Sequence, residues 1–322
     1  MLRIASIGEC MVELSESAEA GAPAAGRMQR TFGGDTLNTA VYLARCLRQS
    51  AAQPPATVHP AAVHPAAVHY VTALGDDPFS AEMLTTWQRE GIETRLVARL
   101  PGRLPGLYII RTDAAGERSF HYWRSAAAAR ELLRGERAAA LAESLAGFDL
   151  VYLSAITLGI LDAESRERLF ALLQRLRQGG SRIAFDSNYR PSLWASEAEA
   201  QEATTRAHAL ASLALPTFDD EAALFGDADP TATLRRLHAL GVEEVAVKAG
   251  QDPCLVGLAG SAPVAVPVEQ RVQPVDTTAA GDSFNGAYLA ARLSGSAPQE
   301  AARAGHSLAA RVIAVKGAII PA

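Results

Sequence analysis

Short apolar runs alternate with helical stretches along most of this chain. Between the apolar runs, Phe79, Met83 and Trp87 fall at helical spacing before Gly91, and Leu169 to Leu176 repeat the pattern before Gly179. This alternation predicts right-handed crossovers and an α/β fold with a mostly parallel sheet covered by helices on both faces. The runs short and apolar enough for buried parallel strands are Leu2 to Ile7, Tyr70 to Leu74, Leu150 to Leu153, Arg182 to Phe185 and Val242 to Val247.

One segment breaks this rhythm. Residues 107–123 read LYIIRTDAAGERSFHYW, two alternating runs joined by Asp113 to Gly116, which is typical of a β-hairpin. A hairpin cannot belong to a parallel sheet, so we expect a second, small β-sheet that acts as a lid and excludes water from a cleft. Its strands are expected within about 9–32 and 94–124, with Met28 to Phe32 and Thr94 to Leu100 as further members.

A low-complexity segment separates the first predicted helix from the next strand. Residues 54–69 read PPATVHPAAVHPAAVH, with His59, His64 and His69 five residues apart. Three histidines suggest a metal site, but a proline in each unit prevents them from sharing one helical face. We therefore interpret 54–69 as a surface loop, with metal binding as the alternative.

Composition narrows the class of protein. The chain has 322 residues, of which 49% are hydrophobic, enough for a large core. A net charge of -5, with both signs interspersed, argues against a nucleic-acid partner. Cys10, Cys46 and Cys254 match neither a disulfide framework nor a zinc spacing. With no signal-peptide pattern and no apolar run of ~20 residues, we expect a cytoplasmic protein without a membrane partner.

The candidate chemistry lies near the C-terminus. Residues 276–288 read DTTAAGDSFNGAY and precede an amphipathic helix. The small residues Ala279, Ala280 and Gly281 allow backbone N–H groups to approach a phosphate, and a helix N-terminus adds partial positive charge, so we predict an anion hole. Asp282 would lie where a phosphoryl group crosses to an incoming hydroxyl, and it is our candidate catalytic base. It could instead only cap the helix, but no G-x-x-x-x-G-K-[ST] phosphate loop occurs elsewhere, which favours catalysis.

Two motifs resemble the ribokinase-like (PfkB) carbohydrate kinase family. Asp276 to Asp282 is similar to its DTxGAGD signature, with Ala280 where many members carry Gly, and residues 31–38, TFGGDTLN, resemble its Gly-Gly sugar-binding turn. The resemblance runs from Leu2 to Pro321. It implies a single three-layer α/β/α domain over 1–322, ATP with Mg²⁺ as cofactors, a small-molecule sugar as substrate and a homo-oligomer formed through the lid.

Within the family, several segments look like the subgroup that phosphorylates 2-keto-3-deoxygluconate, a sugar acid. They are GECMVEL at 8–14, GGDTLN at 33–38, GLYII at 106–110, ERSFHYWR at 117–124, FDSNYRPSLW at 185–194 and GAII at 317–320. An arginine fork suits the carboxylate of such a substrate. The substrate-binding residues implied by the resemblance are Gly34, Asp35, Asn38, Tyr108, Tyr122, Arg124, Arg190 and Asp282.

Some of these residues have simpler interpretations. Tyr108, Tyr122 and Trp123 could be cross-strand packing partners, and for Trp123 we prefer packing. Arg124 and Arg190 could form surface salt bridges. Arg190 nevertheless comes after a predicted strand, where binding residues are expected, and we keep it as functional.

The nucleotide side is implied by the resemblance alone. Lys248, Ala249 and Gly250 match a small-residue turn near ATP, and Asn188 should face the phosphates. Glu221 keeps the acidic residue of the family's metal-linked Asn-x-x-Glu motif, here Phe218 to Glu221, and could act on Mg²⁺ through water. The alternative for Glu221 is a charge at a helix N-terminus. The family's second, C-terminal substrate carboxylate has no match in VIAVKGAIIPA.

The sequence therefore predicts an ATP-dependent kinase that converts 2-keto-3-deoxygluconate to its 6-phosphate. Fructokinase or another sugar kinase of the same family is the first alternative. A non-catalytic sugar or nucleotide sensor on the same scaffold is the second, because a fold does not determine function.

Overall fold

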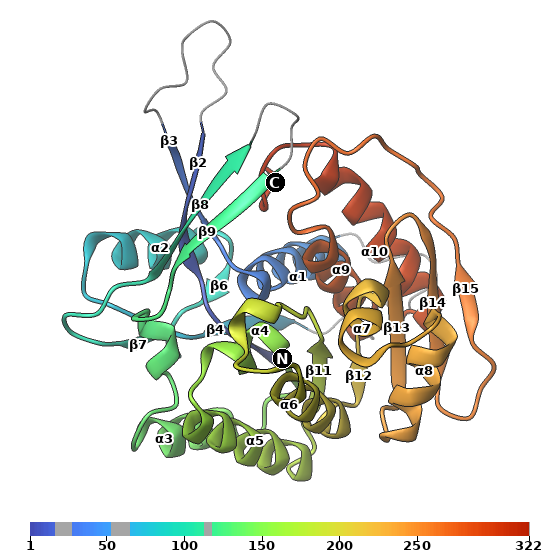
Figure 1. The fold of residues 1–322 in the computed structure, drawn as a ribbon, viewed down its shortest axis with the longest axis horizontal. Coiled ribbons are helices and arrows are strands. Elements are labelled where there is room, and N and C mark those ends of the chain that lie inside the picture. Colours follow the sequence, from blue (N-terminus) through green and yellow to red (C-terminus); the bar gives the residue numbers. More distant parts are fainter. Residues whose placement is uncertain (17–27, 53–64, 113–117, 322) are drawn as a thin grey trace, which may run out of the picture.

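A computed structural model describes residues 1–16, 28–52, 65–112 and 118–321 of the chain. Within these residues, nine strands form a large sheet and four form a small one beside it (Figure 1). In order across the large sheet, the strands are β15 (Val264–Val266), β14 (Asp252–Leu258), β13 (Glu244–Ala249), β12 (Leu213–Ala214), β11 (Arg182–Asp186), β10 (Leu150–Ser154), β1 (Leu2–Ile7), β4 (Ala66–Val71) and β6 (Ile92–Glu93).

The large sheet is mostly parallel, as predicted. Neighbouring strands from β6 to β13 pair in parallel, and only β14 and β15 add antiparallel pairs at one edge. All five predicted parallel strands exist, and most of their boundaries shift by one or more residues. The strand expected at Tyr70 to Leu74 is divided after Val71 into β4 and the short β5 (Ala73–Leu74), and the last one begins at Glu244 rather than Val242.

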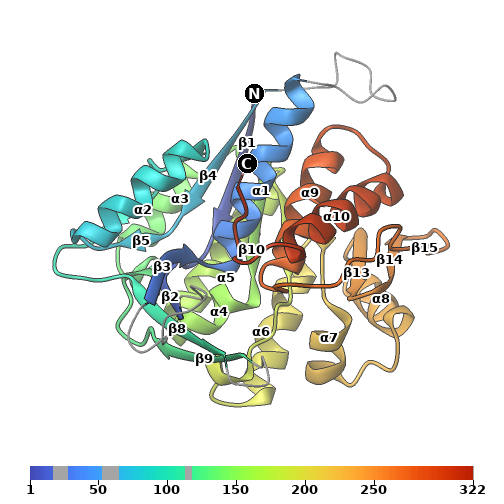
Figure 2. The same ribbon diagram turned by 90° about the horizontal axis from the view of Figure 1, so that it is seen from above.

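Helices cover both faces of this sheet, so the fold has the three predicted layers (Figure 2). Buried residues of α1, α2, α9 and α10 pack on one face, and those of α3 to α6 and α8 on the other. The helices are α1 (Asp35–Ala52), α2 (Pro78–Arg89), α3 (Arg137–Ser144), α4 (Ala155–Ile160), α5 (Ala163–Gln178), α6 (Glu197–Leu210), α7 (Phe218–Phe225), α8 (Pro230–Ala239), α9 (Ala280–Leu293) and α10 (Pro298–Ile313), with 3₁₀ turns η2 (Ala128–Glu131) and η3 (Pro191–Leu193). No helix in these described ranges is both long and apolar enough to cross a bilayer.

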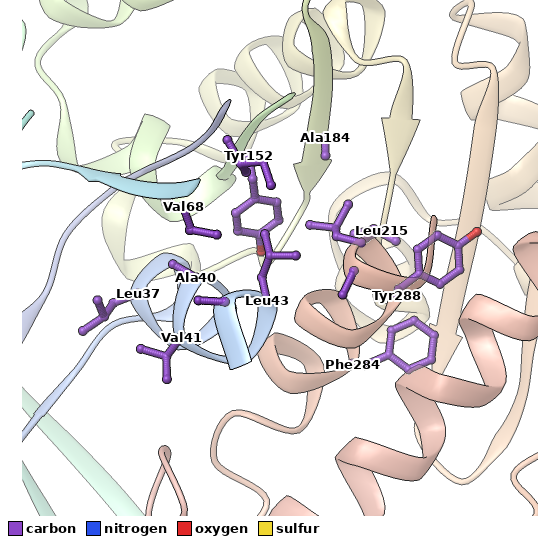
Figure 3. Close-up of a cluster of buried hydrophobic side chains, with 14 of the residues drawn as sticks. Leu37, Ala40, Val41, Leu43, Val68, Tyr152, Ala184, Leu215, Phe284 and Tyr288 are labelled. Carbon is purple, nitrogen blue, oxygen red and sulfur yellow. The ribbon is translucent and has the colours of Figure 1, made fainter. Parts of the chain in front are cut away.

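The two faces result from the alternation of side chains along each strand. In β10, Tyr152 joins the cluster under α1 and α9, while Leu153 joins the cluster under α5 and α6. Figure 3 shows the first cluster, where Tyr152 lies between the sheet and Leu43 of α1. At the α1–α9 contact, a Cβ on Gly286 would lie 2.7 Å from the Cβ of Tyr42, so glycine is needed for this close approach.

The small sheet contains the predicted hairpin. Its strands lie in the order β3 (Met28–Gly33), β2 (Met11–Glu16), β8 (Gly106–Thr112) and β9 (Arg118–Trp123). β8 and β9 pair antiparallel and β2 runs parallel to β8, which confirms a separate sheet that includes Met28 to Phe32. The expected hairpin turn lies outside the described residues.

The prediction that Thr94 to Leu100 joins this small sheet is wrong. The segment instead contains β7 (Ala98–Arg99), which pairs in parallel with β5 in a separate two-stranded sheet. The N–H groups of Ala98 and Leu100 donate to the carbonyls of Thr72 and Leu74, at 2.9 and 2.8 Å. These two hydrogen bonds already pair the backbone N–H groups of the segment, so it does not need a neighbouring strand of the small sheet.

The predicted C-terminal boundary of the surface loop at 54–69 is also wrong, because β4 begins at Ala66. Ala66 to His69 belong to β4, where they pair with β1, and His69 is buried against the ring of Phe148 at 5.0 Å. The last repeat unit thus becomes a strand because its Val68 and His69 lead directly into the apolar Tyr70 and Val71. Residues 54–64, with the other two histidines of the metal alternative, lie outside the described residues.

Candidate active site

A cleft of about 1180 Å³ lies between the small sheet, the carboxyl ends of β11 and β13, and the first turns of α1 and α9. In a parallel sheet this edge collects the loops that bind ligands. All predicted substrate and anion-hole residues line the cleft except Gly250. Gly250 lies in the exposed turn between β13 and β14, where its positive φ of 59° suits a tight turn.

Asp282 lies half-buried in the first turn of α9 and lines the cleft. Its Oδ2 accepts a hydrogen bond of 2.9 Å from Nδ2 of Asn38, in the first turns of α1. Thr39 Oγ1 donates to the backbone carbonyl of Asp282 at 3.2 Å. The two signature motifs, 244 residues apart between Asn38 and Asp282, are therefore joined at one carboxylate.

The ionisation of Asp282 is displaced toward neutral pH. Burial raises the pKa of this carboxyl to about 7, and the nearby charge of Asp35 adds to the rise, while the hydrogen bond from Asn38 and the charge of Lys248 oppose it. A carboxylate with such a pKa can accept a proton from a hydroxyl near neutral pH.

The anion-hole segment is shaped by a left-handed residue just before α9. Ala279 has φ 61° and ψ 17° and is the N-cap residue, a conformation that favours glycine. The sequence analysis assigns the glycine of the family signature to Ala280, but counting back from Asp282 places it at Ala279, where the backbone requires it. The N–H of Ala280 donates to the Thr277 carbonyl at 3.2 Å, whereas those of Ala279 and Gly281 make no hydrogen bond within the described residues.

The turn before α1 presents the predicted sugar-binding residues. A Cβ on Gly34 would collide with the carbonyl oxygen of Glu9, so only glycine allows this approach. Asp35 Oδ2 accepts from Ser154 Oγ at 2.5 Å and from Asn188 Nδ2 at 2.8 Å, and burial raises the pKa of its carboxyl. Asn188 itself has a φ of 20°, unusual for a residue other than glycine.

On the opposite wall, the small sheet supplies two tyrosines. Tyr108 and Tyr122 are cross-strand partners whose rings lie 5.8 Å apart. The hydroxyl of Tyr108 donates to Glu13 on the neighbouring strand β2, and Thr31 donates to the other oxygen of Glu13 at 3.0 Å. Trp123 faces the other side of the sheet, is 57% exposed and does not line the cleft.

Arg124 lines the cleft and is also paired within the protein. Its Nη2 donates to Oε2 of Glu9, and the two side chains are only 11% and 1% exposed. Oε1 of Glu9 and Nε of Arg124 are buried without a hydrogen-bond partner in the described residues. Burial raises the pKa of Glu9, and the charge of Arg124 opposes this rise. Sequence reasoning missed Glu9, although a polar residue directly after a buried strand is a usual signal for a binding edge.

A second buried cation lies on the α9 side of the cleft. Lys248 Nζ donates to Asp186 Oδ2 and to Asn285 Oδ1, both at 3.0 Å. Asn285 Nδ2 donates in turn to Asp186 at 2.7 Å and to the hydroxyl of Tyr152 at 3.1 Å. Neither Asp186 nor Asn285 is among the predicted site residues. Asp186 ends strand β11 and Asn285 lies three residues after Asp282 on one helical face, so both positions carried a signal.

Glu221 does not face the cleft, which contradicts its assignment to the metal. It is fully buried, with Oε2 2.5 Å from Arg236 and Oε1 3.5 Å from Nε2 of His208. Burial alone would raise the pKa of Glu221, but His208 and Arg236 outweigh it and hold the pKa at about 2. The residue that faces the cleft is Asp220, one position earlier on α7.

Asp220 and Arg190 lie together on the wall of the cleft formed by α7 and the segment after β11. Arg190 Nη1 donates to the carbonyl of Tyr189 at 2.7 Å and lies 3.5 Å from Oδ1 of Asp220. Burial raises the pKa of Asp220 to about 6, and the charge of Arg190 opposes the rise. Within the described residues no group of three or more histidine, cysteine or acidic side chains is arranged to hold a metal by itself.

A cleft at the carboxyl edge of a parallel sheet, a half-buried aspartate at a helix N-terminus and unpaired backbone N–H groups beside it define a phosphotransferase site. The chain belongs to the pfkB family of carbohydrate kinases, which matches residues 1–322. It is 49% identical over 321 residues to the 2-dehydro-3-deoxygluconokinase of Escherichia coli (strain K12), covering 99% of this chain and 97% of that protein. It is 47% identical over 320 residues to the enzyme of the same name from Dickeya dadantii (strain 3937), covering 99% and 96%.

Solved structures support the fold. The crystal structure of a PfkB protein from Polaromonas sp. JS666 superposes with a TM-score of 0.80, covering 99% of this chain and 97% of that one at 22% identity. The prediction of a ribokinase-like fold with a small additional sheet is thereby confirmed.

Proposed function

We propose that this protein transfers the γ-phosphoryl group of ATP to the 6-hydroxyl of 2-keto-3-deoxygluconate, the substance also called 2-dehydro-3-deoxygluconate. The observation that carries the proposal is the hydrogen bond between Asn38 and Asp282, which joins the sugar-binding turn and the phosphate segment at one carboxylate. The high identity to two enzymes of that name, over nearly the whole chain, supports this substrate.

In the proposed reaction Asp282 accepts the proton of the 6-hydroxyl as that oxygen bonds to the γ-phosphorus. The bond between the γ-phosphorus and the bridging oxygen to the β-phosphate breaks, and ADP leaves with the electron pair. Charge accumulates on the phosphoryl oxygens, and the N–H groups of Ala279 and Gly281 at the start of α9 are placed to stabilise it.

The sugar is held on the other side of Asp282. Gly34, Asp35 and Asn38 offer backbone and polar groups to its hydroxyls, and the rings of Tyr108 and Tyr122 cover it from the small sheet. Arg124, fixed by Glu9, meets the carboxylate, and Arg190 lies toward the reacting end with Asn188 near the phosphates.

The nucleotide would bind as its magnesium complex. Asp220 fits this role because its carboxyl faces the cleft and is only loosely paired with Arg190, at 3.5 Å. A few carboxylates suffice, since Mg²⁺ keeps several waters and binds the phosphates directly. When bound, the ion would neutralise charge on the β- and γ-phosphates.

Oligomerisation through the lid remains a proposal. Phe120, Tyr122 and Trp123 of β9 are each more than two-fifths exposed, and β9 is an edge strand of the small sheet. Light scattering during size-exclusion chromatography would measure the mass in solution, and a monomer would contradict this proposal.

The function is tested by measuring ADP release with 2-keto-3-deoxygluconate, fructose and ribose as acceptors. We expect the highest kcat/KM for the keto acid. Asp282→Asn should lower kcat by at least ~100-fold with little change in the KM for ATP, because a positioned acid or base acts mainly in the transition state. Near-native turnover in this variant would exclude Asp282 as the base, and a preference for fructose would make the protein a fructokinase.

A further inference from the structure

We propose that Lys248 is a second catalytic residue whose ammonium donates a hydrogen bond to an oxygen of the phosphoryl group in transit. Asp186 and Asn285 are the positioning residues that hold this ammonium in place. The inference rests on the proposed kinase activity, and it gives Lys248 a specific part in the reaction rather than a place in a turn near ATP.

The position of the ammonium is the first argument. Nζ of Lys248 lies 3.4 Å from where a Cβ on Gly281 would stand, so it lies beside the anion-hole segment. The side chain is only 8% exposed, yet it lines the cleft. A cation this close to the transferring group, and shielded from water, stabilises developing negative charge far more than an exposed one.

The backbone at the end of β13 is held on both sides. The pairing of β13 with β14 shifts register between Val247 and Ala249, and the extra residue of this irregularity lies on β14, between Asp252 and Leu255. On the other side of β13 the N–H of Lys248 donates to the carbonyl of Pro216 at 2.8 Å. Lys248 is thus fixed at the carboxyl end of the strand, where its side chain lines the cleft.

One N–H group of the Lys248 ammonium has no acceptor among the described residues. An ammonium has three N–H groups, and two of them are taken by Asp186 and Asn285. No further acceptor within the described residues bonds to Nζ, and the open side of the group is the cleft. The third N–H is thus available to a phosphoryl oxygen.

Asn285 is held so that only its oxygen can face Lys248. Its Nδ2 donates to both Asp186 and Tyr152, and these two bonds use both N–H groups of the amide. Asn285 is fully buried and lies three residues after Asp282 on α9. One helix therefore presents the base to the sugar and, on nearly the same face, the acceptor that holds the cation.

The charge of Lys248 acts on carboxyl groups on two sides of the cleft. It acts to lower the pKa of Asp282 on the sugar side and that of Asp220 on the nucleotide side, against the effect of burial in each case. A cation between these two carboxylates lies near the path of a group that moves from nucleotide to sugar.

The competing interpretation is that Lys248 only neutralises the buried Asp186. The two interpretations predict different activities for a protein from which both charges have been removed together. A purely structural pair can be replaced by uncharged residues of similar shape without loss of function. A catalytic cation cannot.

The test compares kcat for 2-keto-3-deoxygluconate and the KM for ATP in three proteins, namely the unaltered protein, Lys248→Met and the double variant of Lys248 and Asp186. We expect Lys248→Met to lower kcat by ~100-fold or more, with less than about a tenfold change in the KM for ATP, as for loss of one charge-stabilising donor. The pair Asp186→Asn with Lys248→Met should remain equally slow while its melting temperature recovers, and it serves as the folded variant if Lys248→Met alone does not fold. Near-native kcat in either folded protein would overturn the proposal.

Asn285 is tested through its dependence on Lys248. Asn285→Ala should lower kcat by ~10-fold without changing the KM for ATP. The double variant Asn285→Ala with Lys248→Met should be no slower than Lys248→Met alone, because a positioning residue acts only through the group it holds. Losses that multiply would show that Asn285 acts by another route.

Arg292→Met is the matched control. Arg292 lies on the same helix and forms a bidentate pair with the buried Glu244, at 2.7 and 2.8 Å, away from the cleft. This variant should lose stability but keep kcat, and an equal loss of kcat there would attribute the effect of Lys248→Met to α9 as a whole. Absence of ADP release by the unaltered protein would refute the kinase function itself, which separates the two failures.

Discussion

At the scale of single residues, the ionisation of Asp282 links the site to pH. With a pKa of about 7, the carboxyl of the free protein is partly protonated at neutral pH. Because the base must be ionised, kcat/KM should rise with pH to a plateau, with a midpoint near pH 7. Asn38→Ala removes a hydrogen bond that stabilises the charged form, so the midpoint should move to higher pH. A pH profile of each protein checks this, and a midpoint below pH 5 in the unaltered protein would contradict it.

The same shift predicts a change in stability. An aspartate in the unfolded chain has a pKa of about 3.9, so ionising Asp282 in the folded protein opposes folding. This destabilisation develops as pH rises from about 4 to about 7 and is complete above that range. Asp282→Asn should therefore raise the melting temperature at pH 8 by ~2 °C or more and leave it nearly unchanged at pH 4.

Ala279 is a second residue whose local conformation has a measurable consequence. An L-residue in the left-handed region is strained by roughly 1 to 2 kcal/mol, whereas glycine is not. Replacing Ala279 with glycine relieves this strain, but part of the free energy gained is lost because glycine is more flexible in the unfolded chain. We expect Ala279→Gly to be neutral or stabilising by up to ~1 kcal/mol. Ala280→Gly, inside the first turn of α9, is the control and should destabilise, as urea denaturation would show. Clear destabilisation by Ala279→Gly would contradict the assignment of strain.

At the scale of elements, α7 and α8 are held together by a buried charge cluster. Glu221 on α7 pairs with Arg236 on α8, which also pairs with Asp227 at 2.7 Å. Glu221→Gln leaves Arg236 with one partner fewer in a buried setting and should cost about 3 kcal/mol of unfolding free energy at pH 7. Because the pKa of Glu221 is depressed to about 2, this contribution is present above pH ~5 and is lost as pH falls toward 2.

The same variant decides between the two roles considered for Glu221. A structural role predicts that kcat and the Mg²⁺ concentration needed for half-maximal rate stay within about twofold of the unaltered protein. Asp220→Asn is the comparison, since it should raise the Mg²⁺ requirement with less effect on stability. A large change in the Mg²⁺ requirement of Glu221→Gln would restore the assignment of Glu221 to the metal.

Secondary-structure elements differ in how well the local sequence pattern predicts them. The hairpin β8–β9 and the strands β1, β10 and β11 were predictable because alternation or a bounded apolar run extends over their whole length. Thr94 to Leu100 was not, since two-residue strands are defined by their partners rather than by their own residues. On α7 Glu221 was assigned to the metal from the resemblance to a family motif alone, and a motif does not show that Asp220 rather than Glu221 faces the cleft.

At the scale of the whole molecule, the Glu9–Arg124 pair connects the end of the large sheet to the small one. Arg124→Ala should lower kcat/KM for 2-keto-3-deoxygluconate by ~30-fold or more and also destabilise the fold, because Glu9 is left buried and unpaired. The double variant Glu9→Gln with Arg124→Met should recover stability but not kcat/KM for the keto acid. Measuring kcat/KM on the keto acid and on fructose, together with melting temperatures, distinguishes recognition of the substrate carboxylate from stabilisation of the fold. Equal losses on both sugars would mean that the pair only holds the two sheets together.

The site was predictable where one motif carries several functional residues, as at Gly34 to Asn38 and Ala279 to Asp282. It was not where function depends on residues from separate elements. Asp186, Asn285 and Glu9 stand at positions that carry a general signal of a binding edge, but the partner of each is known only from the tertiary packing that places them beside Lys248 or Arg124. Each contributes through a partner distant in sequence, and no local spacing records such a pairing.

The contact between α1 and α9 also bears on how the protein is made. Asn38 and Asp282 are 244 residues apart, and the hydroxyl of Tyr42 is bonded to the backbone of Ala318 and Ile320. During synthesis the side of α1 that packs on α9 therefore stays uncovered until nearly the entire chain has left the ribosome. At roughly 5 to 20 residues per second, that interval lasts tens of seconds. The nascent chain should be a chaperone client until α9 emerges, and a ribosome stalled before residue 280 should carry a partly folded chain without a competent sugar-binding turn.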